Sequence, residues 1–129
     1  MKKLVAAAVV HLDGKTLITR RAPGQNLEGL WEFPGGKVEH EESAQQCITR
    51  ELRDELCVES VAGEMLTTTS YAYPGGEIEL IAILVELQST QFTLQVHDRF
   101  EWVLPQELLR YNLAPADIPI AQEIIRKYG

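Results

Sequence analysis

The sequence contains few cysteines and no long apolar run. Its two cysteines, Cys47 and Cys57, lie ten positions apart without a CxxC or Cys/His spacing. A disulfide framework and a zinc site are therefore excluded as organising features, and we interpret both residues as reduced thiols of a cytoplasmic protein. No segment is long enough to span a membrane, so we expect no membrane partner.

Positive charge is also scarce, with 12 Lys and Arg against 19 Asp and Glu and a net charge of −7. Non-specific binding of a nucleic-acid polymer requires a basic surface, so no such partner is expected. Phosphate groups can still bind an acidic protein through metal ions. The 129 residues, 45% hydrophobic and 24% charged, suit one soluble domain over residues 1–129.

The N-terminal stretch MKKLVAAAVV resembles a secretory signal, but the pattern that follows it favours a strand. Asp13-Gly14 between two apolar runs is a strong hairpin signal, which predicts paired strands over residues 4–12 and 16–19. We therefore expect the N-terminus to remain in the mature protein.

The rest of the chain reads as alternating strands and helices. We predict a loop over 20–29, strands over 30–33, 58–73, 77–87 and 100–104, a turn at 34–36, helices over 43–56 and 118–128, and a helical turn over 105–111. Ser43 and Gln46 form a capping-box pattern at the start of the first helix. The predicted fold class is an α/β sandwich with a mixed sheet.

The first helix carries an unusual group of acids. Glu51, Asp54 and Glu55 have the spacing that places side chains on one helical face, beside the predicted buried face. Desolvated like charges repel one another, and a divalent cation such as Mg²⁺ or Mn²⁺ would relieve that cost. The alternative is a solvated, salt-bridged face on which Arg50 and Arg53 neutralise these acids.

The stretch PGGK lies shortly before this helix. It is not a P-loop, because that motif requires another glycine five positions earlier and a Ser or Thr after the lysine. The glycines can expose backbone carbonyls to a cation, and Lys37 can contact a phosphate. An arrangement in which acids bind metal and the metal binds phosphate reconciles the lysine with the acids.

Taken in order, these residues resemble the Nudix box. Gly36 is followed after five residues by Glu42, and after seven more by the run RELRDELCV, which begins at Arg50. Two positions depart from the family pattern. Asp54 replaces a Glu and shortens the carboxylate by one methylene, whereas Cys57 replaces the Gly that ends the helix in a left-handed conformation at a cost of about 1 kcal/mol.

Segments outside the box extend the resemblance. MKKL, ITRRA and EFPGGK are similar to MutT-type enzymes that hydrolyse 8-oxo-dGTP, and GLWEF and LAPADIPIA to CTP and modified-dCTP pyrophosphohydrolases such as those acting on 5-methyl-dCTP. The resemblance implies a Nudix-type α/β/α sandwich that uses Mg²⁺ or Mn²⁺ to convert a nucleoside triphosphate to monophosphate and pyrophosphate, in nucleotide-pool sanitation and DNA repair. No protein partner is evident. A non-catalytic nucleotide-binding module and an ADP-ribose or nucleotide-sugar hydrolase remain alternatives.

The resemblance also implies roles for individual residues. The metal ligands would be Glu51, Asp54, Glu55 and the Gly35 carbonyl; the supports of the box Gly36, Glu42 and Arg50; the phosphate contacts Arg21 and Lys37; and the catalytic residues Glu51 and Glu55. Glu51 is the first candidate for the general base. Asp98, next to His97, is the candidate for a further acid from a loop, and its alternative is a solvated carboxylate.

Asp117 and Trp31 are the candidates for contacting the nucleotide base. An ionised Asp117 accepts hydrogen bonds, which suits the amino group of cytosine or the donors of oxidised guanine and disfavours thymine and uracil. The alternative is that Asp117 caps the C-terminal helix, with Pro119 in its first turn. Trp31 is a weaker candidate that would line the base pocket. Tyr71 and Tyr73 alternate along a strand and are expected to belong to the sheet and the core.

Overall fold

The computed structural model describes residues 2–129, so Met1 of the MKKL segment lies outside the described residues. In chain order the elements are β1 (Lys2–Val9), β2 (His11–Leu12), β3 (Lys15–Arg21), β4 (Trp31–Glu32), β5 (Gly35–Lys37), α1 (Ala44–Leu56), β6 (Ser60–Tyr73), β7 (Gly76–Leu87), β8 (His97–Val103), the 3-10 helices η1 (Pro105–Arg110) and η2 (Pro115–Asp117), and α2 (Ile118–Tyr128). The predicted α/β class is confirmed.

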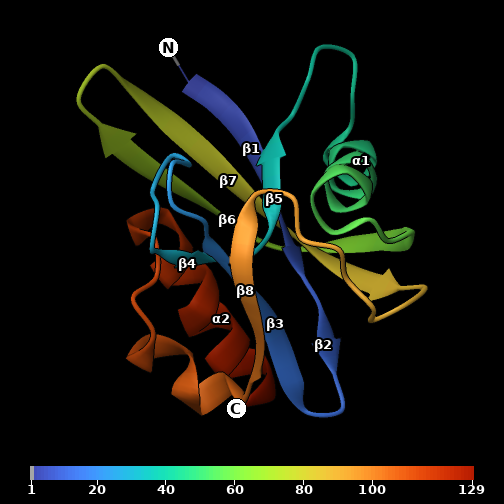
Figure 1. Cartoon of the computed structure of the whole chain (residues 1–129). Coiled ribbons are helices and arrows are strands. Elements are labelled where there is room, and N and C mark those ends of the chain that lie inside the picture. Colours follow the sequence, from blue (N-terminus) through green and yellow to red (C-terminus); the bar gives the residue numbers. More distant parts are fainter. Residues whose placement is uncertain (1) are drawn as a thin grey trace.

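The strands form two four-stranded sheets instead of one. The first has the order β5-β1-β7-β6, in which β1 and β7 run parallel and the other neighbours run antiparallel. In the second, β3 pairs antiparallel with β2, β4 and β8. Helices α1 and α2 lie on opposite sides of this arrangement (Figure 1), which gives the expected α/β/α layering.

Strand β1 is central because both of its faces are buried. Ala6 and Ala8 pack in one core cluster with α1, whereas Ala7 and Val9 pack in the other with α2. A strand covered on both faces reads as a continuous apolar run, which accounts for the signal-like N-terminal stretch.

The predicted N-terminal hairpin is correct at its turn and wrong along its length. Asp13 and Gly14 both have positive φ, at 52° and 82°, as the turn requires. Beyond it, however, β2 and β3 pair at two positions, His11 with Thr16 and Leu12 with Lys15. Residues 2–9 pair instead with β7, because a doubly buried strand needs neighbours inside the first sheet.

The expected turn at 34–36 is also corrected, because Gly35–Lys37 form β5, the edge strand beside β1. A Cβ on Gly35 would lie 1.9 Å from the Ala6 carbonyl oxygen. Glycine therefore serves close strand contact here, with no positive φ required.

Helix α1 begins and ends as its sequence predicts. The Ser43 hydroxyl accepts from the Gln46 backbone N–H at 3.0 Å, and the Gln46 side chain accepts from the Ser43 N–H at 2.8 Å, which completes the capping box. At the other end Cys57 adopts the left-handed conformation, with φ 59°. The helix buries Cys47, Ile48, Leu52, Glu55 and Leu56.

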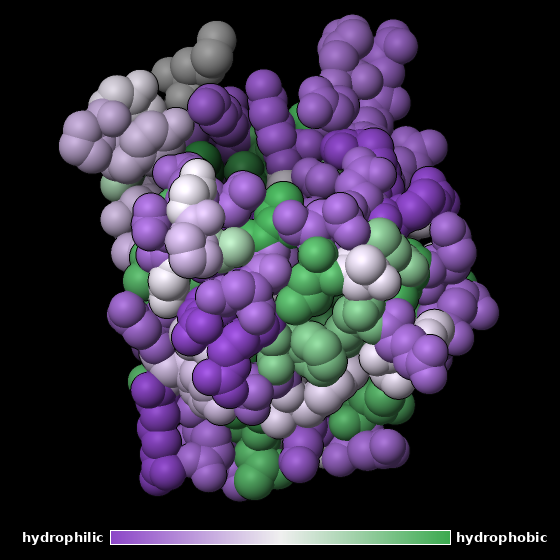
Figure 2. Space-filling model, in the orientation of Figure 1, coloured by the Kyte–Doolittle hydropathy of each residue, from purple (hydrophilic) through white to green (hydrophobic). Residues whose placement is uncertain are grey.

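The surface is largely polar. The face that carries β5 and β8 is mostly hydrophilic, with a smaller apolar area near its centre (Figure 2). Tyr71 and Tyr73 lie on β6 as expected, but Tyr71 is exposed. Among residues 2–129, no helix combines the length and the apolar character that crossing a membrane requires.

Candidate active site

Strand β5, which contains Gly35 and Gly36, lies directly against Glu51, the first candidate for the general base. A Cβ on Gly36 would lie 1.7 Å from Oε2 of Glu51, so the carboxylate of α1 occupies the space that any other side chain would fill. Residue type at position 36 is therefore set by contact between β5 and α1. This explains in physical terms why a glycine precedes the acidic helix.

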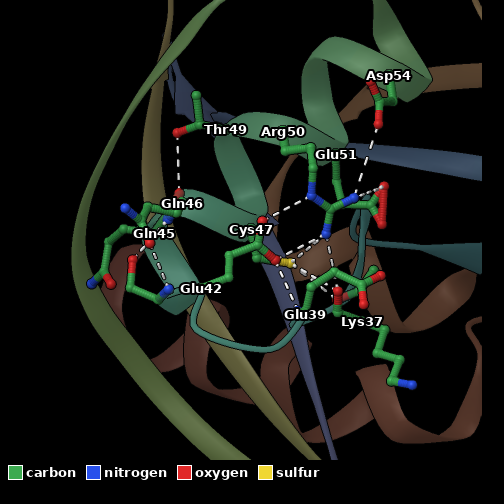
Figure 3. A network of polar contacts seen from close by, with 12 residues as sticks. Lys37, Glu39, Glu42, Gln45, Gln46, Cys47, Thr49, Arg50, Glu51 and Asp54 are labelled. Atoms are coloured by element: carbon green, nitrogen blue, oxygen red, sulfur yellow. Dashed lines mark hydrogen bonds and ion pairs between the residues drawn. The ribbon is translucent and has the colours of Figure 1, made fainter.

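An ion pair fastens the start of the box to the same helix (Figure 3). Arg50 contacts Glu42 through two nitrogens, at 2.8 and 3.0 Å, and donates to the Lys37 carbonyl oxygen at 3.1 Å. The Arg50 hydrogen bonds lower the pKa of Glu42 to about 2, with further help from the Glu39 backbone. The structure thus brings Glu42 and Arg50 into direct contact, and their role as supports of the box stays a prediction.

The three acids of α1 differ in burial. Side-chain exposure is 16% for Glu51 and 60% for Asp54, whereas Glu55 is buried. Arg50 approaches Glu51 at 3.5 Å and Asp54 at 3.9 Å, as the salt-bridged alternative requires, but Arg53 pairs with Glu59 instead. The cluster is therefore only partly neutralised.

Burial sets the proton affinity of these carboxyl groups. Desolvation raises the pKa of Glu51. It raises the pKa of Glu55 further, to about 8, with added repulsion from Glu32 and Glu51, while Arg21 acts in the opposite direction. Oε1 of Glu55 is buried and has no hydrogen-bond partner among residues 2–129. An unpartnered carboxylate oxygen among other acids is a donor set that suits a hard divalent cation, so the residues fit the implied Mg²⁺ or Mn²⁺.

Two residues that the sequence did not assign join this cluster. Glu32 of β4 and His97 of β8 lie together with Nε2 of His97 2.8 Å from Oε2 of Glu32. One ligand atom each from Glu32, Glu55 and His97 lie within 4.8 Å of one another. Glu32 could have been found from the sequence, because adjacent strand residues face opposite ways and Glu32 follows the core residue Trp31. The inward orientation of His97 depends on the register of β8, which local sequence does not give.

Asp98 does not reach this cluster through any contact in the described chain. Adjacent strand residues face opposite ways, so His97 points inward while Asp98 forms a two-pronged ion pair with Arg20, at 2.8 Å for each bond. The arginine lowers the pKa of Asp98. The expectation of a further acid from this region stays a prediction, and the side chain that the strand places inward is the imidazole.

A cleft of about 210 Å³ adjoins the carboxylate cluster. Its lining includes Arg21, Glu32, Gly35, Gly36 and Asp117. The other lining residues are mainly apolar: Val5, Ala6, Ala7, Asn26, Leu27, Phe33, Ile78, Leu80, Ala114 and Ala116. The predicted phosphate-contacting Arg21 is thus in the cleft, where it donates to the Asn26 carbonyl at 3.0 Å. Lys37 is exposed on β5 and does not line it.

Asp117 is a buried cleft residue and not a helix cap. It directly precedes α2 and Pro119 is in the first turn, but the Asp117 side chain makes no capping hydrogen bond in the described chain. Its exposed fraction is 6%, and desolvation raises its pKa well above the usual value, with repulsion from Glu32 as a second cause. The capping alternative is therefore wrong.

Trp31 lies elsewhere than expected. Its indole is buried in the core cluster with α2, packs edge-on against Tyr111 at 5.2 Å between ring centroids, and is absent from the residues lining the cleft. We therefore correct the expectation that Trp31 lines a base pocket.

Comparison with known proteins identifies the family to which the chain belongs. A sequence model of the NUDIX domain matches residues 5–123. The chain belongs to the Nudix hydrolase family, and within it to the MutT type. The CTP pyrophosphohydrolase of Escherichia coli (strain K12) is 42% identical over 120 residues, which cover 92% of this chain and 87% of the relative.

Two further relatives agree. The 8-oxo-dGTP diphosphatase of Escherichia coli (strain K12) is 29% identical over 128 residues, covering 98% of this chain and 99% of the relative. The solution structure of the E. coli ORF135 protein matches with a TM-score of 0.87 at 38% identity, over 97% of this chain and 89% of that chain. These similarities agree with the Nudix-type fold described above.

Proposed function

We propose that the protein hydrolyses a nucleoside triphosphate to the monophosphate and pyrophosphate with the help of Mg²⁺ or Mn²⁺. The observation that carries the proposal is the cleft, which joins a carboxylate cluster and Arg21 to the buried Asp117. Intact acids at positions 51, 54 and 55 favour turnover over a binding module. Glu51, Asp54, Glu55 and the Gly35 carbonyl would hold the cation, which when bound neutralises phosphate charge and lowers the pKa of water.

The residues of the chain supply positioning and proton transfer. Arg21 and Lys37 would orient the phosphates. Glu51 lies against Gly36 and burial raises its pKa, so it is our first candidate for the general base. Arg50, held by Glu42, fixes the rotation of the helix that carries it.

We propose Asp117 as the base-contacting residue. Its raised pKa favours the neutral carboxyl, which donates one hydrogen bond as well as accepting. That pair matches the acceptor N3 and the amino donor of cytosine, in line with the similarity to a CTP pyrophosphohydrolase. A neutral carboxyl can also match thymine or uracil, which weakens the expectation that these bases are disfavoured.

The test is a panel of CTP, dCTP, 5-methyl-dCTP, dGTP, 8-oxo-dGTP and dTTP with Mg²⁺, with nucleotide products and pyrophosphate quantified. Glu51→Gln should abolish turnover, and Glu86→Gln, an exposed acid on β7, should not. Monophosphate plus pyrophosphate would support the mechanism. Binding without turnover in the wild type would instead indicate a non-catalytic module. If no triphosphate is cleaved but ADP-ribose or a nucleotide sugar is cleaved in a separate assay, the other alternative holds.

The role of Asp117 is tested by two substitutions. Asp117→Asn keeps a donor and an acceptor and should stay within about ten-fold of wild type in kcat/KM for the preferred base. Asp117→Leu removes both and should cost roughly 100-fold, because the polar edge of the base is then left unpaired. Equal losses across all bases in Asp117→Leu would contradict base reading by this residue.

We further propose that the protein acts in the cytoplasm on the free nucleotide pool. Hydrolysis of an oxidised or modified triphosphate there would prevent its incorporation, which is the route by which such an enzyme would contribute to DNA repair. The rank of 8-oxo-dGTP and 5-methyl-dCTP against their unmodified counterparts in the panel tests this assignment.

A further inference from the structure

His97 is buried in a way that its packing alone does not explain. Its side chain is 0% exposed, and its one polar contact in the described chain is the 2.8 Å approach of Nε2 to Glu32. The other ring nitrogen, Nδ1, is buried without a partner among residues 2–129. Burying Nδ1 without a hydrogen-bond partner costs free energy. In the part of the chain that the structure describes, the imidazole therefore meets the acids only through Nε2.

The spacing of the facing atoms matches one edge of a metal coordination sphere. Bonds of roughly 2.1 Å at right angles place neighbouring ligand atoms about 3 Å apart, and opposite ones about 4.2 Å apart. Nε2 of His97 and Oε2 of Glu32 are 2.8 Å apart, and the Glu55 oxygen joins them within 4.8 Å. A cation could therefore bind between these side chains with small side-chain shifts.

We propose that Glu32, Glu55 and His97 form an inner cation subsite that prefers a transition-metal divalent ion over Mg²⁺. The inference rests on the proposed function, in that Glu55 would be shared with the cation held by Glu51 and Asp54. Imidazole nitrogen is a ligand of transition metals, whereas Mg²⁺ prefers oxygen, so His97 gives this subsite its selectivity. Oε1 of Glu55, which has no partner in the described chain, supplies the shared oxygen.

Arg21 would compete with a cation for the Glu32 carboxylate. Its Nη1 lies 3.5 Å from the same Oε2 of Glu32 that His97 contacts. Without a cation, the arginine and the imidazole both contact the Glu32 carboxylate. A bound cation would take that place and leave Arg21 free for the phosphates of the substrate.

The experiment uses Mn²⁺ as the probe and its pulsed electron paramagnetic resonance spectrum as the readout. Wild-type protein should show ¹⁴N modulation from a coordinated imidazole. His97→Gln, which keeps a hydrogen-bond donor toward Glu32, should lose this modulation and bind Mn²⁺ at this subsite ten- to 100-fold more weakly, with less than about three-fold change in Mg²⁺ affinity. Glu32→Gln should weaken Mn²⁺ in the same way. His11→Gln removes a partly buried histidine outside the cluster and should leave the spectrum unchanged.

The outcomes separate this inference from the proposed function. Absence of ¹⁴N modulation in a wild-type protein that hydrolyses triphosphates would overturn the inner subsite and leave the proposed function intact. Imidazole-bound Mn²⁺ in a protein without turnover would support the subsite and count against the hydrolase. Unchanged Mn²⁺ affinity in a folded His97→Gln variant would show that His97 only holds Glu32 in place, and would overturn the proposal.

Discussion

At the scale of single residues, the contact between Gly36 and Glu51 gives the sharpest prediction. Gly36→Ala places a methyl group where Oε2 of Glu51 lies, so the carboxylate must move away. We expect kcat to fall on the order of 100-fold, since a misplacement of about 1 Å has that effect, while circular dichroism shows a folded protein. Gly63→Ala is the control, because its Cβ would meet only the Leu84 carbonyl, at 3.2 Å. Full activity in Gly36→Ala would show that the position of Glu51 is unimportant.

The raised pKa of Glu55 predicts how metal-free stability depends on pH. The folded state keeps the proton up to about pH 8, whereas an unfolded Glu releases it near 4.5. Stability should therefore fall as pH rises between these values and level off above the upper one. Glu55→Gln removes the contribution of this group and should be up to about 5 kcal/mol more stable than wild type at pH 9. Urea unfolding in the presence of a chelator measures this, and a parallel slope in Glu55→Gln would contradict it.

Local spacing predicted the residues of the box well, because their meeting depends on one helix and one adjacent strand. Arg50 contacts Glu42, the residue with which the resemblance grouped it, and Glu51 lies against Gly36, a contact that the sequence did not specify. The inward choice of His97 over Asp98 could not be predicted in the same way. It depends on the register of β8 against β3, where the pairing shifts beside Arg20, and a shift of one residue exchanges the two faces of a strand.

At the scale of elements, the end of α1 carries a correctable strain. Cys57 holds φ 59°, where glycine is favoured. Cys57→Gly should raise the free energy of unfolding by about 0.5–1 kcal/mol, and its kcat should be unchanged. Cys57→Ala removes the thiol but keeps a Cβ, so it should give no gain. If both variants gain equally in urea unfolding, the thiol and not the backbone is responsible.

At the scale of the whole molecule, cation binding should appear as stability. A ligand that binds only the folded state adds about 2.7 kcal/mol at 100 times its Kd. Thermal unfolding temperature should therefore rise with Mg²⁺ or Mn²⁺ and fall again with chelator. Glu55→Gln lacks the central ligand and should rise much less, whereas the exposed-site control Glu86→Gln should rise like wild type. A cation-independent midpoint in the wild type would argue against a folded-state cation site.

The overall architecture was predictable in its class and order but not in its sheet partners. Residue patterns located α1, α2 and the turn at Asp13-Gly14, since these depend on neighbours along the chain. The division into two sheets follows instead from β1 pairing with β7, a contact between distant segments. Strand propensity carries no information about which distant strand is the partner.

The same parallel pair has a consequence for how the chain folds. Strand β1 (Lys2–Val9) precedes the other described strands in the sequence, yet its parallel partner begins only at Gly76. Closing so long a loop before its contacts form is slow, so the second-sheet hairpin at Asp13-Gly14 can assemble first. Strand β5, whose Gly36 lies against Glu51, is held in the sheet by its pairing with β1. We therefore expect β5 to be fixed in place only after β1 has paired with β7. The candidate active-site cleft should likewise assemble after this pairing, late in folding.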